Sequence, residues 1–142
     1  MVKQISVFLE NKEGRLADVT QTLGENSINI RALSIADTTD FGILRIIVND
    51  PDKALAALKA AEFTVSIKEV LAIGIVDEAG SLSKALRKLQ ENGIVIEYMY
   101  AFSGKSGDKP LVILKLSDNQ KAEKVLTAIG IAVISAEEVY SL

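Results

Sequence analysis

The hydrophobic positions of this chain predict the same succession of strands and helices twice. Short runs rich in β-branched and aromatic residues predict four strands in the first half, at 5–9, 28–36, 42–48 and 63–67. Apolar residues at helical spacing predict helices after Gly14 and after Pro51. The second half repeats this order, with strands at 71–76, 94–102, 111–116 and 131–134 and helical stripes that begin at Leu82 and Ala122. Each half therefore has the order β-α-β-β-α-β.

The two halves are related by a nearly constant offset. From Gly14 to Gly80 the offset is 80 − 14 = 66, and it becomes 68 after the predicted hairpin tip at 103–108. The repeated order is that of the ferredoxin-like split βαβ unit. We therefore expect an α+β fold of two ferredoxin-like domains in tandem, at residues 1–70 and 71–142. Right-handed crossovers would place the first and third strands of each domain in the centre, with both helices on one face.

The composition narrows the possible chemistry. The 142 residues include 16 Lys and Arg against 19 Asp and Glu, so the net charge is −3, and neither His nor Cys occurs. A basic footprint for nucleic acid or for a membrane surface is therefore not expected. Thiol catalysis, histidine general bases and the usual zinc ligands are excluded. No apolar run is long enough for a membrane span or a signal peptide, so we expect a cytoplasmic protein.

The central strands barely alternate between apolar and polar residues. The runs 43–48 and 111–114 are almost continuously aliphatic, which indicates that both faces of the sheet are covered. Scattered exposed valine and isoleucine residues would be a simpler explanation. Stacking against a second chain is the alternative that we favour, and we expect a homodimer.

A glycine stands at each predicted strand-to-helix junction, Gly14 in the first half and Gly80 in the second. Such a glycine allows a tight turn after which the first helical N–H groups face open space, where they attract a carboxylate or phosphate. A tight turn alone would also explain one glycine. Repetition of Gly-x-Leu in register, each time after an Asn or Asp, favours a binding role.

These motifs resemble those of the ACT domain, a small regulatory module that commonly binds amino acids. The family pattern of Asp/Asn-x-x-Gly-x-Leu, followed by a strand that opens like Gly-Ile-Asn-Ile, is matched twice. The first match is 11–16 with 27–30, and the second is 77–82 with 93–96. The resemblance covers essentially the whole chain and implies a tandem ACT domain protein.

The resemblance further implies that the two sheets join side by side through their second strands, 28–36 and 94–102. An amino acid would lie between the helix-opening loop of one half and the second strand of the other. Carried over to this sequence, the ligand-binding residues are Asn11, Glu13, Gly14, Arg15, Leu16, Asn29 and Ile30, with Asp77, Ala79, Gly80, Ser81, Leu82, Val95 and Ile96. Asn11 or Asp77 would face the amine, and the loop backbones would hold the carboxylate.

Departures from the family pattern set the two loops apart. The residue before the glycine, often proline in the family, is Glu13 in one copy and Ala79 in the other, and Val95 stands in the position of Asn29. Glu13 would repel a bound carboxylate unless its side chain turned outward. The first loop is therefore the weaker candidate. Arg15 could reach the ligand or simply be solvated.

Two other groups of residues have simpler explanations than a site. Tyr98, Tyr100 and Phe102 alternate along one strand without interleaved basic residues, which favours a core or interface stripe over a stacking platform for bases. Aspartates 37, 40, 50 and 52 suit turns and helix caps better than a cation site.

We therefore expect a non-enzymatic, allosteric regulatory module that binds a small amino acid, needs no cofactor or metal, and has neither nucleic-acid nor membrane partners. The regulated partner could be an enzyme of amino-acid biosynthesis. One alternative is a regulatory subunit that acts on such an enzyme by direct contact, without a ligand. Another is a small enzyme that uses Asp77, Glu13 or Tyr98 for acid–base chemistry.

Overall fold

The computed structural model describes residues 1–10, 12–37 and 40–142, apart from the side chains of 103–105. The chain forms two compact units, one of Lys3–Lys68 and one of Met1–Val2 with Glu69–Leu142. The predicted boundary between residues 70 and 71 lies inside a strand that runs from the first unit into the second.

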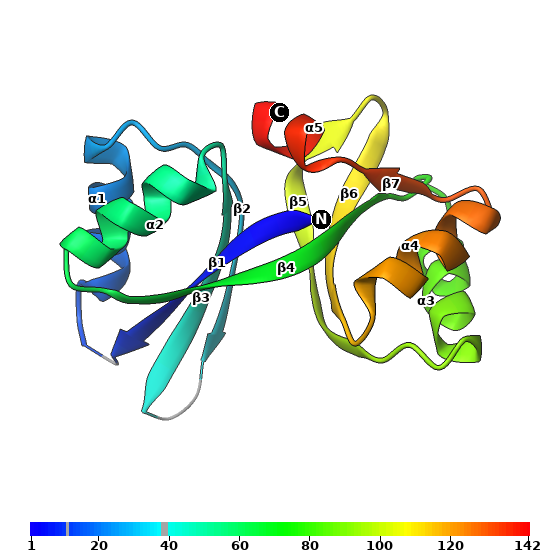
Figure 1. Ribbon diagram of the computed structural model, residues 1–142, viewed down its shortest axis with the longest axis horizontal. Coiled ribbons are helices and arrows are strands. Elements are labelled where there is room, and N and C mark those ends of the chain that lie inside the picture. Colours follow the sequence, from blue (N-terminus) through cyan, green and yellow to red (C-terminus); the bar gives the residue numbers. More distant parts are fainter. Residues whose placement is uncertain (11, 38–39) are drawn as a thin grey trace. The chain divides into compact units, whose positions relative to one another are not determined.

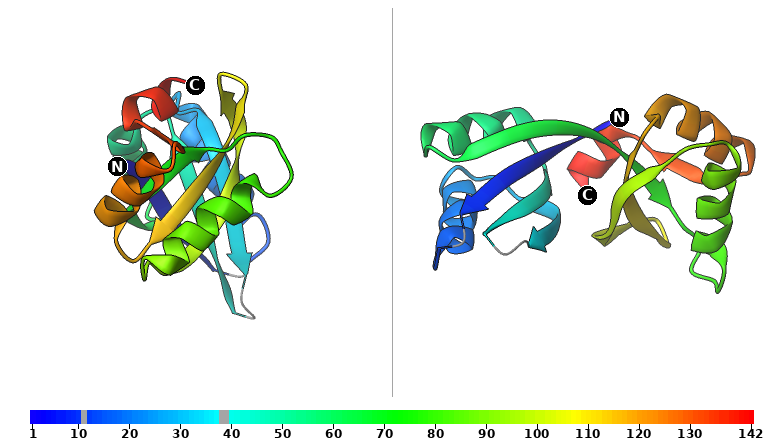
Figure 2. Two further views of the ribbon diagram at one scale, coloured as in Figure 1. Left: turned by 90° about the vertical axis from the view of Figure 1, so that its right-hand side faces the viewer. Right: turned by 90° about the horizontal axis from the view of Figure 1, so that it is seen from below.

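The first unit has the predicted order of elements, and its two helices lie on the same face of its sheet (Figures 1 and 2). The strand order is β2-β3-β1-β4, with the first and third strands in the centre. All described ladders in this unit are antiparallel. The elements are β1 (Val2–Glu10), α1 (Arg15–Glu25), β2 (Ile30–Asp37), β3 (Phe41–Val48), α2 (Pro51–Ala60) and the first part of β4 (Thr64–Gly74).

The second unit repeats this arrangement, with strand order β7-β4-β6-β5. Its two long helices, α3 and α4, contact each other beside the sheet (Figure 1). The elements after β4 are α3 (Ser81–Glu91), β5 (Ile96–Ser106), β6 (Lys109–Leu116), α4 (Asn119–Ala128), β7 (Ala132–Ile134) and α5 (Ala136–Ser141). The α+β fold of two ferredoxin-like units, repeated in tandem, is thereby confirmed.

Three local expectations need correction. The strands expected at 63–67 and 71–76 are one continuous strand, β4, because the polar residues Lys68 and Glu69 keep the extended backbone. The hairpin tip is only Gly107–Asp108, because β5 and β6 pair as far as Ser106 and Lys109. Helix α5 was not expected, and it is capped by Ser135, whose Oγ accepts a hydrogen bond from the Glu138 N–H. The turn expected at 37–40 falls partly outside the described residues.

Equivalent residues start the second helix of each unit. The side chain of Asp50 accepts from the Lys53 N–H at 3.1 Å, and that of Asp118 accepts from the Lys121 N–H at 3.0 Å. An aspartate at this position satisfies one of the N–H groups that have no partner inside the helix. Capping was the role expected for Asp50, and the structure confirms it.

Each unit has its own apolar core between sheet and helices. In the first unit, Val19 and Leu23 of α1 and Leu58 of α2 pack against buried residues of β1 and β3. In the second, Ala85, Leu89 and Leu126 have the same role against β4 and β6. Helical spacing of these residues explains why each helix presents only one apolar face.

The central strands are buried on both sides, as their lack of alternation indicates. Ile46 and Ile47 of β3 are both fully buried, as are Ile113 and Leu114 of β6. Neighbouring residues of a strand point to opposite faces, so these strands have buried apolar side chains on both faces.

Candidate functional site

The two strand-to-helix junctions have the same backbone geometry. Gly14 and Gly80 precede α1 and α3 with φ of +82° and +88°, a region that favours glycine. A Cβ at either glycine would meet no atom within 4 Å. The backbone conformation, and not a lack of space, therefore requires glycine at both positions.

The same backbone hydrogen bonds hold both junctions. In the first, Lys12 N donates to Glu10 O at 2.7 Å, Arg15 N to Lys12 O at 3.4 Å and Asp18 N to Gly14 O at 2.9 Å. The three equivalent bonds of the second junction measure 2.8, 3.2 and 3.0 Å and join Glu78 to Val76, Ser81 to Glu78 and Lys84 to Gly80. Every bond recurs 66 residues later, so the repeat extends to the hydrogen-bonding pattern.

Among the described residues, no side chain caps α1 or α3, whereas aspartates cap α2 and α4. The N–H groups of the second and third helical residues have no acceptor inside a helix. These residues are Leu16 and Ala17 in α1, and Leu82 and Ser83 in α3. Each junction thus presents backbone donors at the positive end of a helix dipole, which suits a carboxylate.

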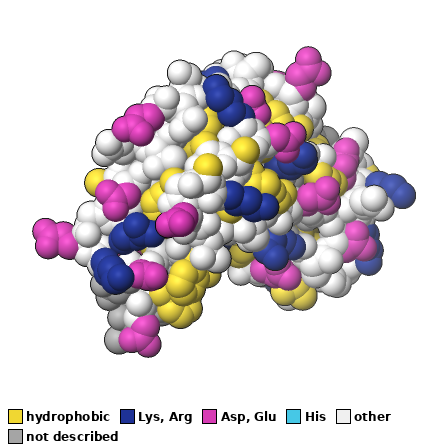
Figure 3. Space-filling view, turned by 60° about the vertical axis from the view of Figure 1, so that its left-hand side comes forward, with side chains coloured by type: hydrophobic (Ala, Val, Ile, Leu, Met, Phe, Trp, Pro, Cys, Tyr) yellow, Lys and Arg dark blue, Asp and Glu magenta, His cyan; other side chains and the backbone are white. Residues whose placement is uncertain are grey.

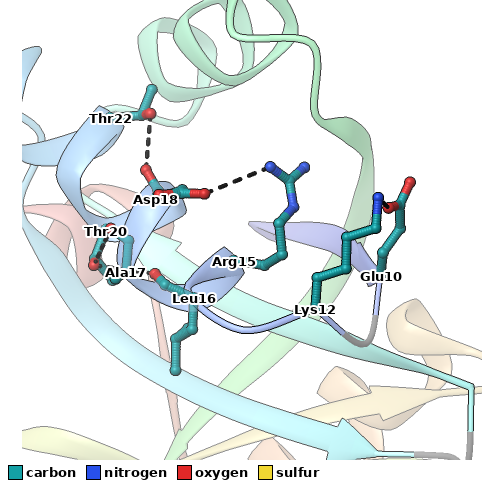
Figure 4. A network of polar contacts seen from close by, with 8 residues as sticks. All are labelled: Glu10, Lys12, Arg15, Leu16, Ala17, Asp18, Thr20 and Thr22. Atoms are coloured by element: carbon teal, nitrogen blue, oxygen red, sulfur yellow. Dashed lines mark hydrogen bonds and ion pairs between the residues drawn. The ribbon is translucent and has the colours of Figure 1, made fainter.

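The side chain of Arg15 contacts its own unit. Its guanidinium carbon lies 4.6 Å from the centroid of the Phe63 ring, and Nη1 lies 3.6 Å from Oδ2 of Asp18 (Figure 4). Its Nε is buried and has no hydrogen-bond partner among the described residues. Arg15 is therefore engaged by Phe63 and Asp18.

A second ion pair lies beside it. Lys12 Nζ is 2.8 Å from Oε2 of Glu10 (Figure 4). The hydrogen bond from Lys12, its positive charge and the charge of Arg15 lower the pKa of the Glu10 carboxyl. The equivalent positions of the second junction are Val76, Glu78 and Ser81, so the second junction lacks this cluster of charges.

Equivalent hydrogen bonds also hold the residues that directly precede β2 and β5. The Asn29 N–H donates to Oδ1 of Asn49 at 2.9 Å, and the Val95 N–H donates to Oγ of Ser117 at 2.9 Å. In return, Asn49 N donates to Asn29 O, and Ser117 N to Val95 O. The side chains of Asn29 and Val95 are both exposed, which leaves them available to a ligand.

The other predicted residues fall into two groups. Glu13, Asp77 and Ala79 are exposed in the loops. Ile30, Ile96 and Leu82 pack against the cores, whereas Leu16 is 41% exposed. Asn11 lies outside the described residues.

Three exposed apolar side chains were missed by the sequence analysis. Leu33 and Ile35 of β2 are 53% and 41% exposed, and Met99 of β5, equivalent to Leu33, is 40% exposed. They lie on the helix-covered face by register, opposite Ile46, Leu44 and Leu114. Their strands stand at one end of the strand order of each unit. Apolar residues in a predicted strand are expected to be buried, so the sequence of β2 and β5 did not indicate that these side chains are exposed.

The described residues contain no group of three or more acidic, histidine or cysteine side chains placed to hold a metal ion. Within the same residues, no helix is long and apolar enough to cross a membrane. On the face seen in Figure 3, basic and acidic side chains are interspersed and form no basic stripe.

Comparison with known proteins agrees with the two ferredoxin-like units. The family model described as ACT domain pair matches residues 1–142. The chain belongs to this family. There is no significant match among curated proteins.

Several solved structures are similar to this chain. The crystal structure of protein BT0572 from Bacteroides thetaiotaomicron is 43% identical, with a TM-score of 0.92 over 99% of this chain and 96% of that one. The regulatory subunit of aspartate kinase from Thermus thermophilus, in its ligand-free form, is 20% identical, with a TM-score of 0.65 over 89% of each chain. The corresponding subunit from Thermus flavus is 17% identical, with a TM-score of 0.62 over 89% of each chain. The two Thermus proteins share the fold with this chain.

Proposed function

We propose that this protein is a non-catalytic regulatory module whose strand-to-helix junctions bind the carboxylate of a small amino acid. The observation that carries this proposal is the repeated helix start: a left-handed glycine, no side-chain cap from the described residues and the same three backbone hydrogen bonds at Gly14 and Gly80. A helix end without a cap is stabilised when an anion occupies it. Membership of the ACT domain pair family supports the same function.

The geometry of each unit determines which residues could share one ligand. In the first unit, Glu10 pairs with Phe41 at one end of β3, and Ile30 pairs with Val48 at the other. Seven residues separate these ends, roughly 24 Å at about 3.4 Å per residue. A small amino acid cannot reach both Gly14 and Asn29 of one unit. A ligand that touches both kinds of residue would therefore take the loop and the strand from different units or different chains.

We propose the second junction as the stronger site. Ala79 has no charge where Glu13 has a carboxylate, and this junction has no equivalent of Glu10. A ligand carboxylate there would meet the Leu82 and Ser83 N–H groups, and the nearest loop carboxylate, Glu78, is one residue further from the glycine than Glu13 is from Gly14. Asp77 stands where it could accept hydrogen bonds from the amine.

We propose a homodimer, supported by the exposed apolar side chains of β2 and β5. Leu33, Ile35 and Met99 would be removed from water by a second chain, and this burial would stabilise the association. Regulation would follow if the amino acid bound one arrangement of the protein more tightly than another. The output would pass to another protein, for which an enzyme of amino-acid biosynthesis is our candidate, since the Thermus relatives are regulatory subunits of aspartate kinase.

Thermal unfolding against the twenty amino acids, each at millimolar concentration, tests this proposal. A ligand at 100 times its dissociation constant adds about 2.7 kcal/mol of stability, and each kcal/mol raises the midpoint by roughly 2–4 °C for a chain of this size. We expect a shift for one or two amino acids. It should be lost in Gly80→Asp, which places a carboxylate at the site.

Gly107→Asp is the matched control, since Gly107 also has positive φ and open space around it. This variant should keep the shift. If no amino acid stabilises the protein, the amino-acid-binding function is wrong. Recovery of a stable complex with a biosynthetic enzyme in that case would favour the alternative, a subunit that acts by direct contact without a ligand.

A further inference from the structure

An open groove of about 640 Å³ lies within the second unit and includes part of its helix-opening loop. The ends of β4 and α4 and one side of α3 form its walls. This volume is within the range of small-molecule sites. The groove contains four basic side chains, Lys84, Arg87, Lys88 and Lys109, but only two acidic ones, Glu78 and Glu91. Its charge is thus +2, although the whole protein has a net charge of −3.

Two of these basic groups have no partner among the described residues. Lys88 Nζ lies 3.7 Å from a carboxylate oxygen of Glu91, and Arg87 donates a hydrogen bond to Gln90. No ion pair or hydrogen bond engages the ammonium groups of Lys84 and Lys109 within the described part of the chain. Unpaired cations that line one concave surface attract anions more strongly than cations on a flat surface.

In the first unit, large side chains occupy the position that corresponds to this groove. Ser81 and Ile131 both line the groove, and their equivalents in the first unit are Arg15 and Phe63. Arg15 stacks on Phe63 at 4.6 Å, so large side chains occupy the corresponding position. Small residues in the second unit leave that space open.

The charge also differs at the equivalent positions. Where the groove has Lys84, Arg87 and Lys88, the first unit has Asp18, Gln21 and Thr22. Counted over all positions equivalent to the lining, the first unit has two cations and four carboxylates, a charge of −2. The charged equivalents are Lys12, Arg15, Glu10, Asp18, Glu25 and Glu62. The cationic groove is therefore a property of one copy of the repeat.

We propose that this groove binds a small polyanion, a molecule that has two or more phosphate or carboxylate groups. Lys84 and Lys109 would bind these groups, and the hydroxyls of Ser81 and Ser83, which also line the groove, would donate further hydrogen bonds. Val76, Ile129 and Ile131 line the same groove and suit an uncharged body of such a molecule. The protein would thus respond to a second class of ligand besides the proposed amino acid.

Isothermal titration calorimetry tests the proposal, with inorganic pyrophosphate and citrate as ligands, at low ionic strength and again at 0.15 M salt. The two probes distinguish phosphate from carboxylate chemistry. We expect at least one to bind, with an affinity that falls as salt is added. Lys84→Gln with Lys109→Gln should weaken binding about tenfold or more. Lys53→Gln with Lys59→Gln, two exposed lysines of α2, removes the same charge and should leave the affinity within about twofold.

A third variant tests the groove and not only its charge. Ser81→Arg with Ile131→Phe introduces the residues that fill the first unit, so it should abolish binding although it adds a positive charge. Failure of both probes to bind the wild-type protein would overturn the proposal, and so would equal weakening by the two lysine variants. If a polyanion binds but no amino acid does, the proposed amino-acid-binding function is wrong, whereas the proposed polyanion groove still stands.

Discussion

The guanidinium carbon of Arg15 lies 4.6 Å from the centroid of the Phe63 ring, across 48 residues of sequence (63 − 15). This contact joins the start of α1 to the segment before β4, and it makes Arg15 part of the structure of the first unit. The second unit has Ser81 and Ile131 in these positions. The helix starts thus share a backbone geometry but differ in the side chains around it.

We predict that Arg15 and Phe63 are energetically coupled. Arg15→Ala should destabilise the protein, because it removes a cation–π contact between a partly exposed guanidinium and a buried ring, worth at least about 0.5–1 kcal/mol. In a double-mutant cycle with Phe63→Leu, measured by urea unfolding, we expect a coupling energy of about 0.5–1 kcal/mol. Additive effects of the two substitutions would mean that the contact does not stabilise the fold.

The Glu10 carboxyl should titrate below its usual range, with Lys12 as the main cause. Because the pKa of the Glu10 carboxyl is lower in the folded protein than in the unfolded chain, its charge stabilises the fold at pH values above the unfolded-state pKa. This stabilisation is lost as the pH falls through the folded-state pKa. Lys12→Met should raise the pKa of Glu10 toward its ordinary value, observable by NMR titration of the carboxyl carbon. Lys53→Met serves as a control that should leave it unchanged, and an unchanged pKa in Lys12→Met would contradict the assigned cause.

Replacement of the junction glycines should destabilise the protein through the backbone alone. Gly14→Ala and Gly80→Ala put a side chain on residues with φ of +82° and +88°, at a cost of about 1–2 kcal/mol each. Gly24→Ala is the matched control: Gly24 lies inside α1 and has equally open surroundings. It should stabilise the protein by about 0.5–1 kcal/mol. Equal effects of the three substitutions on urea unfolding would contradict this explanation.

The position before the second strand offers a stabilising substitution. Ser27 has φ of +56°, and its equivalent in the second unit is Gly93, with φ of +70°. Ser27→Gly should therefore stabilise the protein by up to about 1 kcal/mol, because the left-handed strain of a residue that has a side chain is removed. Gly93→Ser should have the opposite effect. Unfolding midpoints that move in the same direction in both variants would contradict the prediction.

Much of the fold could be predicted because the sequence repeats it. Apolar periodicity located the first four helices and the strands, and the recurrence of Gly14 at Gly80 located both junctions. Continuity of β4 could not be predicted, since Lys68 and Glu69 resemble a polar linker and backbone pairing does not depend on apolar side chains. Helix α5 has six residues, too few for a helical period to be recognised.

The candidate site was less predictable from sequence than the fold. The backbone geometry at Gly14 and Gly80 could be inferred, because few residues other than glycine adopt it. The role of Arg15 could not, since its partner Phe63 is distant in sequence and only folding brings them together. The charge of the groove was hidden for the same reason: Lys84 and Lys109 belong to different elements, α3 and β6.

The central claim is that the uncapped helix starts bind the carboxylate of an amino acid. The most direct test is the ¹H–¹⁵N NMR spectrum of the labelled protein, recorded as the amino acid selected by thermal unfolding is added. We predict that the largest chemical-shift changes occur at the amides of Leu82 and Ser83, with Leu16 and Ala17 following if the first junction also binds. If the ligand shifts other amides and leaves these four unchanged, or if no amino acid changes the spectrum, the claim is wrong.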